Sequence, residues 1–134
     1  IIDAVNSGVI DIVSSFHTPQ DEESKRLPFE KAAAGAVGLE TLLPASLQLF
    51  HNQSVSLGKL IRTMTLNPAI LLNLPSGRIT PGAPADLIIF DADTPFILDR
   101  ETLKSKSKNT PYDGQKLQGK VRRTIVSGKT IFEC

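Results

Sequence analysis

The pattern of apolar residues changes character once along this chain, near Gly77, and that change limits the folds open to it. Ahead of Gly77, a short apolar run at residues 9–13 is followed by segments in which leucines recur at helical spacing. After Gly77 the sequence is rich in turns and in short β-branched and aromatic runs. We therefore expect an α/β chain in which residues 1–76 carry one strand and several helices. Residues 77–134 should be β-rich, with too few strands to close a sheet alone.

The first part predicts three helices after its strand. Apolar residues from Leu39 to Phe50 recur every three or four positions, with Pro44 either in the first turn or at a kink. Ser56 fits the N-cap of a second helix. Asn67 fits the N-cap of a third, short helix with Pro68 at its first helical position.

The second part predicts strands and one hairpin. Residues 86–90 predict a strand, and the continuous apolar run from Leu87 to Phe90 is typical of one buried on both faces. Residues 96–98 are a further short strand candidate. Residues 121–126 and 130–132 flank Ser127 and Gly128, a pattern that predicts a hairpin.

Composition excludes several classes of protein. The 134 residues hold 15 basic and 14 acidic side chains. The overall charge therefore predicts no electrostatic attraction to nucleic acid or to a membrane surface. A lone cysteine rules out an internal disulfide, and no apolar stretch approaches a membrane span. We expect a cytoplasmic protein, with the basic run at residues 104–108 forming a solvated loop.

The start of the chain predicts that it is a piece of a longer protein. There is no initiating Met, and residues 1–5 have the pattern of the end of a helix, closed by Gly8 in a left-handed conformation. Apolar helix faces and sheet edges would then stay uncovered in this segment. We expect self-association or dependence on the missing part.

The short strand at residues 9–13 leads into a long polar loop, residues 16–35, that carries the functional signal. Loops of this length inside a compact domain are usually lids or binding loops. Barrel enzymes place their chemistry where a strand runs into such a loop. The loop therefore holds the candidate site.

Four stretches in order and spacing resemble the C-terminal portion of the dihydroorotases, within the cyclic amidohydrolases. They are Ser15–Gln20 with Lys25 behind it, the Gly38-Leu39-Glu40-Thr41 sequence, Gly77–Leu87, and Ser107–Lys129. The resemblance implies a (β/α)8 TIM barrel plus a small β-sandwich domain. Residues 1–76 would be the last strand or strands and helices of the barrel, and residues 77–134 a segment of the β domain.

The activity that this resemblance implies is the zinc-dependent, reversible cyclisation of N-carbamoyl-L-aspartate to dihydroorotate in de novo pyrimidine biosynthesis. In the family, an Asp of the signature binds metal and takes a proton from water. This chain has Phe16 there, and a phenyl ring has no lone pair for zinc or for a proton. Its bulk would tend to fill the metal pocket. We expect no catalytic residue and no metal ligand in this segment, which alone should be inactive.

The resemblance also implies which residues contact substrate. The candidate substrate-binding residues are His17, Pro19, Gln20, Ala34 and Gly35. Gln20 stands where the family has a His that contacts the substrate carboxylate, and an amide supplies no charge there. His17 has other interpretations, as a solvated loop residue or as a recruited metal ligand or base. Gly35 and Gly38 have a second interpretation too, in which they only permit a tight entry to the following helix.

Four further polar residues have mainly structural interpretations. Lys25 and Arg26 either steer the substrate carboxylates or are solvated. Glu40 should favour the first turn of its helix. His51 is expected on the surface.

Three functions follow from these residues. The first is a dihydroorotase, with a homo-oligomeric assembly expected. The second is a catalytically degenerate, dihydroorotase-like subunit that supports a partner such as aspartate carbamoyltransferase, and Phe16 and Gln20 favour it. The third is a dihydropyrimidinase-type cyclic amidase, against which Pro19 and Lys25 argue. A register slip, or a site with another base, would also explain Phe16.

Overall fold

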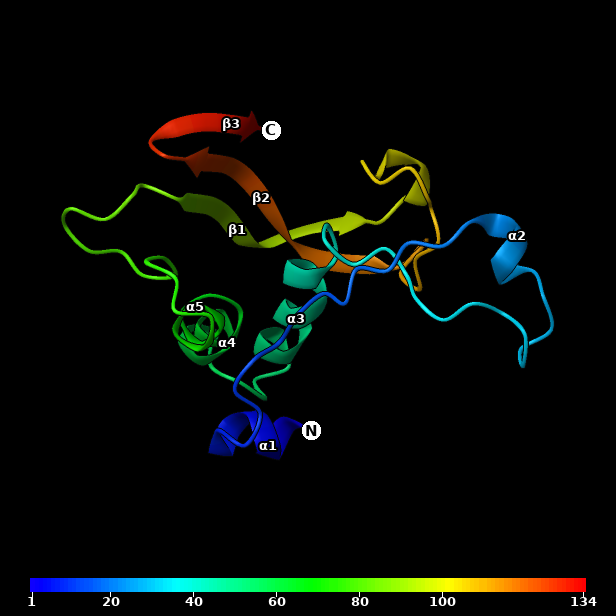
Figure 1. The fold of residues 1–134 in the computed structure, drawn as a ribbon, viewed down its shortest axis with the longest axis horizontal. Helices are drawn as coiled ribbons and strands as arrows, with labels where there is room; N and C mark the ends of the chain where they lie inside the picture. Colours follow the sequence, from blue (N-terminus) through cyan, green and yellow to red (C-terminus); the bar gives the residue numbers. More distant parts are fainter.

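The computed structural model describes all residues, 1–134, as a mixed α/β chain (Figure 1). Its elements in chain order are α1 (Ile2–Ser7), α2 (Glu22–Lys25), α3 (Leu42–His51), α4 (Leu57–Met64), α5 (Leu66–Leu71), β1 (Leu87–Ile97), the 3-10 helix η1 (Arg100–Thr102), β2 (Lys116–Val126) and β3 (Lys129–Glu133). The helices precede the strands, as the change of pattern at Gly77 predicts. No helix has the length and hydropathy that crossing a membrane requires.

The three strands form one antiparallel sheet in the order β1-β2-β3. The predicted hairpin is confirmed, because Ser127 and Gly128 both take positive φ, 49° and 77°, as a tight two-residue turn requires. β1 is longer than predicted and joins both expected strands into one. The prediction that its first half is buried on both faces is wrong, since Ile88 and Ile89 remain 49% and 51% exposed.

An irregularity inside β1 organises a small polar network. The register against β2 shifts between Asp91 and Pro95, and the Asp91 carboxylate accepts from the backbone N–H groups of Asp93 (3.0 Å) and Thr94 (3.1 Å). The Arg122 guanidinium approaches the same carboxylate at 3.5 Å. The Thr94 side chain, these backbone donors and Arg122 lower the pKa of Asp91 to about 2.

Helix α3 packs against β2 and brings the two parts of the chain together (Figure 1). Pro44 lies in its first turn, so the helix runs unkinked past it. At the contact, β2 has Gly119 with φ +108°, and a Cβ there would lie 2.3 Å from Leu47 Cδ1. The close approach of helix and sheet therefore depends on a glycine.

The other helix boundaries are partly as predicted. α1 ends at Gly8 with φ 80°, and α4 follows Ser56. The predicted cap of α5 is wrong, because Thr65 precedes the helix and Asn67 lies inside it. The Asn67 side chain instead donates to the carbonyl of Asp11 (2.7 Å), which ties the helix to the segment after α1.

The predicted strand at residues 9–13 is wrong, since these residues are extended but belong to no sheet. Their backbone makes isolated bonds only, such as Val13 N–H to the Thr63 carbonyl (3.2 Å). An apolar run becomes a strand only where a neighbour completes the ladder, and no other strand of this chain lies beside it.

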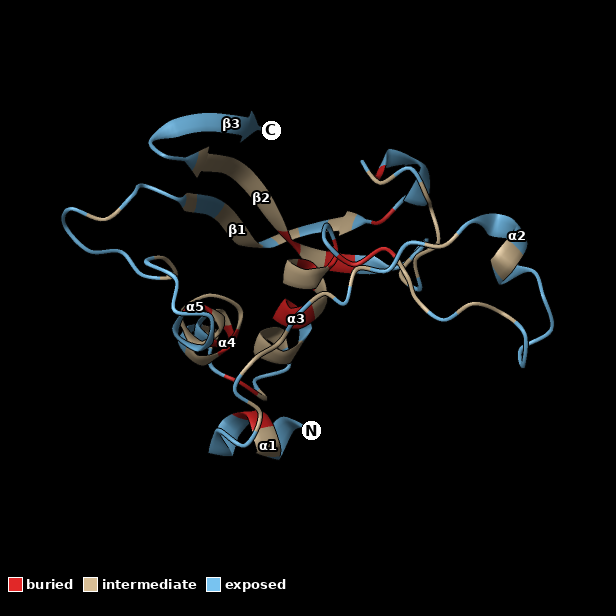
Figure 2. Cartoon of the chain, in the orientation of Figure 1, coloured by how far each residue is buried: buried red, intermediate tan, exposed pale blue.

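Only 15 of the 134 residues are buried, and eight of them form two small apolar clusters (Figure 2). One cluster joins α1, α3 and α4 through Val5, Leu47, Val55 and Leu60. The other consists of Val37, Leu98, Leu103 and Leu117. Apolar side chains stay exposed elsewhere, for example Ile70, Leu71 and Leu72 on α5, so the prediction of uncovered helix faces is confirmed. The division into residues 1–76 and 77–134 stays a prediction.

Candidate functional site

The candidate site is built from two extended segments that run side by side. The signature segment, residues 14–20, forms a parallel bridge to the return segment, residues 33–38, at His17 and Ala36. Thr18 donates its backbone N–H to the Ala36 carbonyl at 3.0 Å. The substrate loop, residues 20–35, leaves the first segment and comes back through the second (Figure 1).

Two glycines make this close approach possible. A Cβ on Gly35 would lie 2.4 Å from the Thr18 carbonyl oxygen, and one on Gly38 would lie 2.4 Å from that of Ser15. Real Cβ atoms do not approach a carbonyl oxygen so closely, and Gly35 also has φ +123°. These glycines therefore permit the contact between the two segments, and their role is not limited to a local turn.

His17 is held by the return segment. Its Nδ1 accepts the backbone N–H groups of Gly38 (3.1 Å) and Leu39 (3.3 Å). An accepting Nδ1 carries no proton, so the neutral ring has its hydrogen on Nε2. His17 is thus a half-buried anchor whose remaining polar atom is a donor, and the alternatives of a solvated residue or a free base at Nδ1 are both wrong.

Phe16 lies beside this anchor in an unusual backbone conformation. Its φ is 43°, in the left-handed region that bulky residues rarely adopt. The side chain is 86% exposed, and the residue borders the groove described below. That its ring fills a metal pocket stays a prediction, because no cluster of metal-ligating side chains defines such a pocket here. Phe16 supplies neither a metal ligand nor a proton acceptor.

The substrate loop is fixed from inside by α2. The Asp21 carboxylate accepts from the backbone N–H of Ser24 (2.7 Å) and caps the helix, and this bond lowers the pKa of Asp21. Lys25 then places its Nζ on the carbonyls of Ala33 (2.8 Å) and Gly35 (3.2 Å). Lys25 is therefore a loop brace and not a free steering charge.

The remaining loop residues differ in exposure. The Arg26 guanidinium pairs with the Glu22 carboxylate at 3.0 Å on the surface, so its charge is already balanced and is not free to steer a substrate carboxylate. Pro19 and Ala34 are exposed at the ends of the loop, and Gln20 is half-buried. The structure thus brings all five predicted substrate-binding residues to the two ends of one loop.

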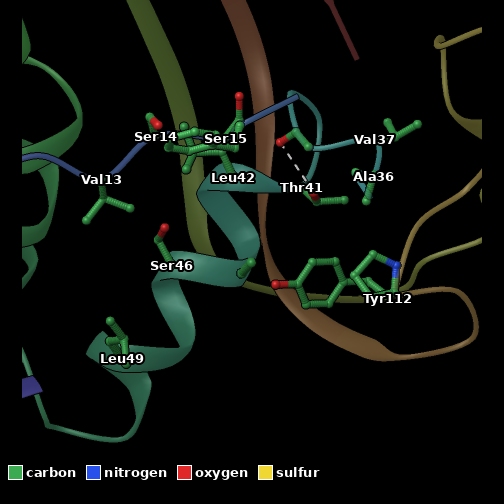
Figure 3. A pocket seen from close by; sticks show the side chains of 15 residues that line it. Val13, Ser14, Ser15, Ala36, Val37, Thr41, Leu42, Ser46, Leu49 and Tyr112 are labelled. Carbon is green, nitrogen blue, oxygen red and sulfur yellow. Dashed lines mark hydrogen bonds between the residues drawn. The ribbon is translucent and has the colours of Figure 1, made fainter. Parts of the chain in front are cut away.

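A groove of about 670 Å³ lies between the two segments and the first half of α3 (Figure 3). Its volume is in the range of small-molecule pockets. The lining mixes aliphatic side chains and Phe16 with hydroxyl-bearing residues, which are Ser14, Ser15, Thr41, Ser46 and Tyr112. The Tyr112 hydroxyl points toward α3 (Figure 3). No carboxylate, histidine or lysine lines it, so the groove offers shape and hydrogen bonds but no acid or base near neutral pH.

Two polar residues next to the site do not lie as predicted. Glu40 precedes α3, and its carboxylate accepts from the backbone N–H groups of Lys104 (2.7 Å) and Ser105 (3.3 Å). His51 is not on the surface, since its side chain is 19% exposed and its Nε2 lies 3.0 Å from the Ala92 carbonyl. Both contacts join residues far apart in the sequence, which local patterns do not report.

A zinc ion does not fit the residues of this chain by themselves. Such a site needs three or four histidine, cysteine or carboxylate donors converging on one point. No three side chains of these types gather closely enough among the 134 residues, and Nδ1 of His17 is already engaged.

Comparison with known proteins identifies the class to which this chain belongs. The profile of the Amidohydrolase family matches residues 1–131, and the chain belongs to that family. It is 47% identical to the dihydroorotase of Ehrlichia chaffeensis over 134 residues, and 41% identical to that of Aquifex aeolicus over 133 residues. The chain spans 30% and 31% of the length of these two relatives and is covered to 100% and 99%. The resemblance to dihydroorotases is therefore confirmed.

Solved structures show the same fold. L-hydantoinase (dihydropyrimidinase) from Arthrobacter aurescens superposes with a TM-score of 0.89 at 33% identity, over 98% of this chain and 31% of that chain. Dihydropyrimidinase from Brevibacillus agri superposes with a TM-score of 0.91 at 22% identity, over 98% and 30%. The second likeness supports the amidohydrolase fold alone.

Sequence reasoning missed the segment after η1. Residues 103–109, which we call the strap, contact the return segment and Glu40, and Pro111 and Tyr112 beyond it line the groove. The resemblance included Ser107–Tyr112, but gave no reason to place it at the site. The role of the strap becomes clear only from the hydrogen bonds that Asn109 makes to the backbone of the loop and of the return segment.

Proposed function

We propose that the protein carrying these residues is a dihydroorotase, which interconverts N-carbamoyl-L-aspartate and dihydroorotate. The observation that supports this most is the paired signature and return segments, which present all five predicted substrate-binding residues at one place. Similarity to dihydroorotases over the whole chain selects this reaction among those of the family.

In the cyclising direction, the ureido nitrogen of N-carbamoyl-L-aspartate attacks the side-chain carboxyl carbon and water leaves. In the reverse direction, water adds to the ring carbonyl carbon and the ring C–N bond breaks. Substrate and product share a planar ureide group with hydrogen-bonding edges. The exposed Ala34 and the adjoining backbone suit such an edge, because small residues let a ligand reach the main chain.

His17 would act as a donor and not as a base. Its Nδ1 is occupied by two backbone N–H groups, so Nε2–H is the atom free to bind a carbonyl or carboxylate oxygen. Gln20 adds a neutral amide at the same end of the loop. Zinc and its ligands, which dihydroorotase activity would require, must come from residues that this chain does not include.

We place these residues in the last part of a (β/α)8 barrel, residues 1–76, and in a small β domain, residues 77–134. The uncovered apolar side chains of α5 support packing against further parts of the protein, and a homo-oligomer is the assembly we propose.

Phe16 supports one competing function, a catalytically degenerate subunit that stabilises a partner such as aspartate carbamoyltransferase. The two functions differ in turnover. The test is to purify the full-length gene product with zinc and follow both ureides by chromatography. A dihydroorotase converts each into the other, and a degenerate subunit converts neither.

The substitution Phe16→Asp sharpens this test. If the missing carboxylate limits turnover, the variant exceeds the wild type by at least tenfold, within the range of general acid–base contributions. Phe29→Asp is the matched control, since Phe29 is a 97% exposed phenylalanine in the same loop. Equal and measurable turnover by wild type and Phe16→Asp would show that the base lies elsewhere. Turnover of dihydrouracil or hydantoin, but not of dihydroorotate, would favour a dihydropyrimidinase-type amidase.

A further inference from the structure

Asn109, in the strap, joins the two ends of the substrate loop. Its Oδ1 accepts the backbone N–H of Gln20 at 3.0 Å, and its Nδ2 donates to the Gly35 carbonyl at 3.0 Å. Its own carbonyl accepts the backbone N–H of Val37 at 2.8 Å. One half-buried residue therefore spans the point where the loop opens and the point where it closes.

The chemistry of these contacts is specific to asparagine. One planar group must accept through one atom and donate through another, as a carboxamide does; a carboxylate has no donor, and a hydroxyl has only one polar atom. The backbone conformation at Gly35 would be strained for any other residue. The Gly35 carbonyl also accepts a hydrogen bond from Lys25 Nζ at 3.2 Å. The carbonyl of Gly35 is thus held by two donors from different segments.

The strap that carries Asn109 is itself anchored at its other end. The carboxylate of Glu40 accepts from Lys104 and Ser105, and Leu103 is buried against Val37. Lys108 folds its Nζ back onto the Leu103 carbonyl at 2.6 Å, which shapes the strap between the two anchors. Asn109 is therefore presented by a braced segment and is not a mobile side chain that happens to reach the loop.

We propose that Asn109 is a positioning residue that sets the separation of the two substrate-binding ends of the loop, at Gln20 and Gly35. This inference rests on the proposed function, in which those ends contact the ureide. Because Asn109 acts on backbone positions and not on the reacting atoms, its loss should weaken substrate binding much more than the chemical step.

The experiment uses Asn109→Ala and Asn109→Asp in the zinc-loaded, full-length gene product, with dihydroorotate as substrate. Alanine removes both side-chain bonds, whereas aspartate keeps the acceptor for Gln20 and loses the donor to Gly35. Asn52→Ala and Asn52→Asp are the matched controls, because Asn52 is exposed and its side chain makes no hydrogen bond. Amide hydrogen exchange at Gln20 and Thr18 reports on the loop separately from activity.

We expect Asn109→Ala to raise KM about tenfold, the equivalent of one to two hydrogen bonds, with kcat changed less than twofold. Exchange at Gln20 should accelerate. In Asn109→Asp the Gln20 amide stays protected while KM still rises, and both controls behave as the wild type. An unchanged KM in either Asn109 variant, with or without a lower melting temperature, would overturn the proposal.

Failure of the proposed function gives a different result. If the wild type turns over neither ureide, that function is wrong, and exchange alone decides the role of Asn109. Faster exchange at both Gln20 and Thr18 in Asn109→Ala, but not in Asn52→Ala, would still show that Asn109 sets the loop ends. Unchanged exchange at these amides would refute it.

Discussion

The backbone at Phe16 offers a direct test of the conformation of the signature segment. Phe16 has φ 43° and an 86% exposed side chain, so removing its ring costs little buried area while any residue with a Cβ keeps the conformational cost. Comparing Phe16→Ala with Phe16→Gly isolates that cost, because both variants remove the ring and differ only in the Cβ.

The magnitude follows from two opposing effects. A left-handed conformation costs a residue with a Cβ about 1–2 kcal/mol, and glycine avoids this cost. Glycine loses about 0.5–1 kcal/mol more conformational entropy on folding than alanine. Phe16→Gly should therefore exceed Phe16→Ala in free energy of unfolding by roughly 0.5–1 kcal/mol.

Urea unfolding of the purified protein measures this difference. Ser14 provides the control pair, since it is exposed, lies two residues away and is not among the residues with positive φ. There the order should invert, with the glycine variant less stable than the alanine variant by about 0.5–1 kcal/mol. If the glycine variant is the less stable one at both positions, Phe16 does not occupy the left-handed region and the described signature segment is wrong.

Three further predictions concern the anchor, the helix–sheet contact and the β1 network. His17→Asn, whose Oδ1 can replace Nδ1, should lose less than half of the roughly 1–3 kcal/mol lost by His17→Ala in urea unfolding, and His17→Gln, which reaches the wrong position, should resemble alanine. A His17→Asn variant as unstable as His17→Ala would refute the acceptor role. Gly119→Ala should cost about 2–4 kcal/mol, from overpacking against Leu47 and a positive φ, whereas Gly128→Ala, with open space around it, should cost only about 1 kcal/mol. Similar losses at both glycines would contradict the close helix contact. Because the pKa of Asp91 is lowered from 3.8 to about 2, its contribution to stability is complete above about pH 4 and is lost as the pH falls through about 2. Asp91→Asn should remove this part of the pH dependence, and identical acid unfolding curves for wild type and variant would refute it.

The parts of the fold that the sequence predicts are those that neighbouring residues determine. The β2–β3 hairpin, the glycine end of α1 and the position of Pro44 in α3 each depend on the conformational preference of one or two residues. These preferences are local. The structure confirms the hairpin and the glycine end of α1, and of the two positions open to Pro44 it shows the first turn.

The parts that the sequence does not predict depend on distant partners. The apolar run at residues 9–13 reads as a strand, yet a strand needs a neighbouring ladder that its own residues do not specify. His51 reads as a surface residue until β1 brings the Ala92 carbonyl to it. At the site, the resemblance located the loop ends, but the bonds from Asn109 to Gln20 and Gly35 cross 89 and 74 positions and leave no local pattern.

The way the substrate loop is fastened has a consequence for how new specificities arise. Residues 26–32 lie between the Lys25 brace and the return segment, and most are exposed, including Leu27 and Phe29. The closing contacts do not depend on the identity of these residues, and the entropy of closing a loop grows only slowly with its length. Residues 26–32 can therefore serve as an exchangeable cassette. Substitutions and insertions there would alter what the exposed part of the loop presents to other molecules, while the fastened ends keep their geometry.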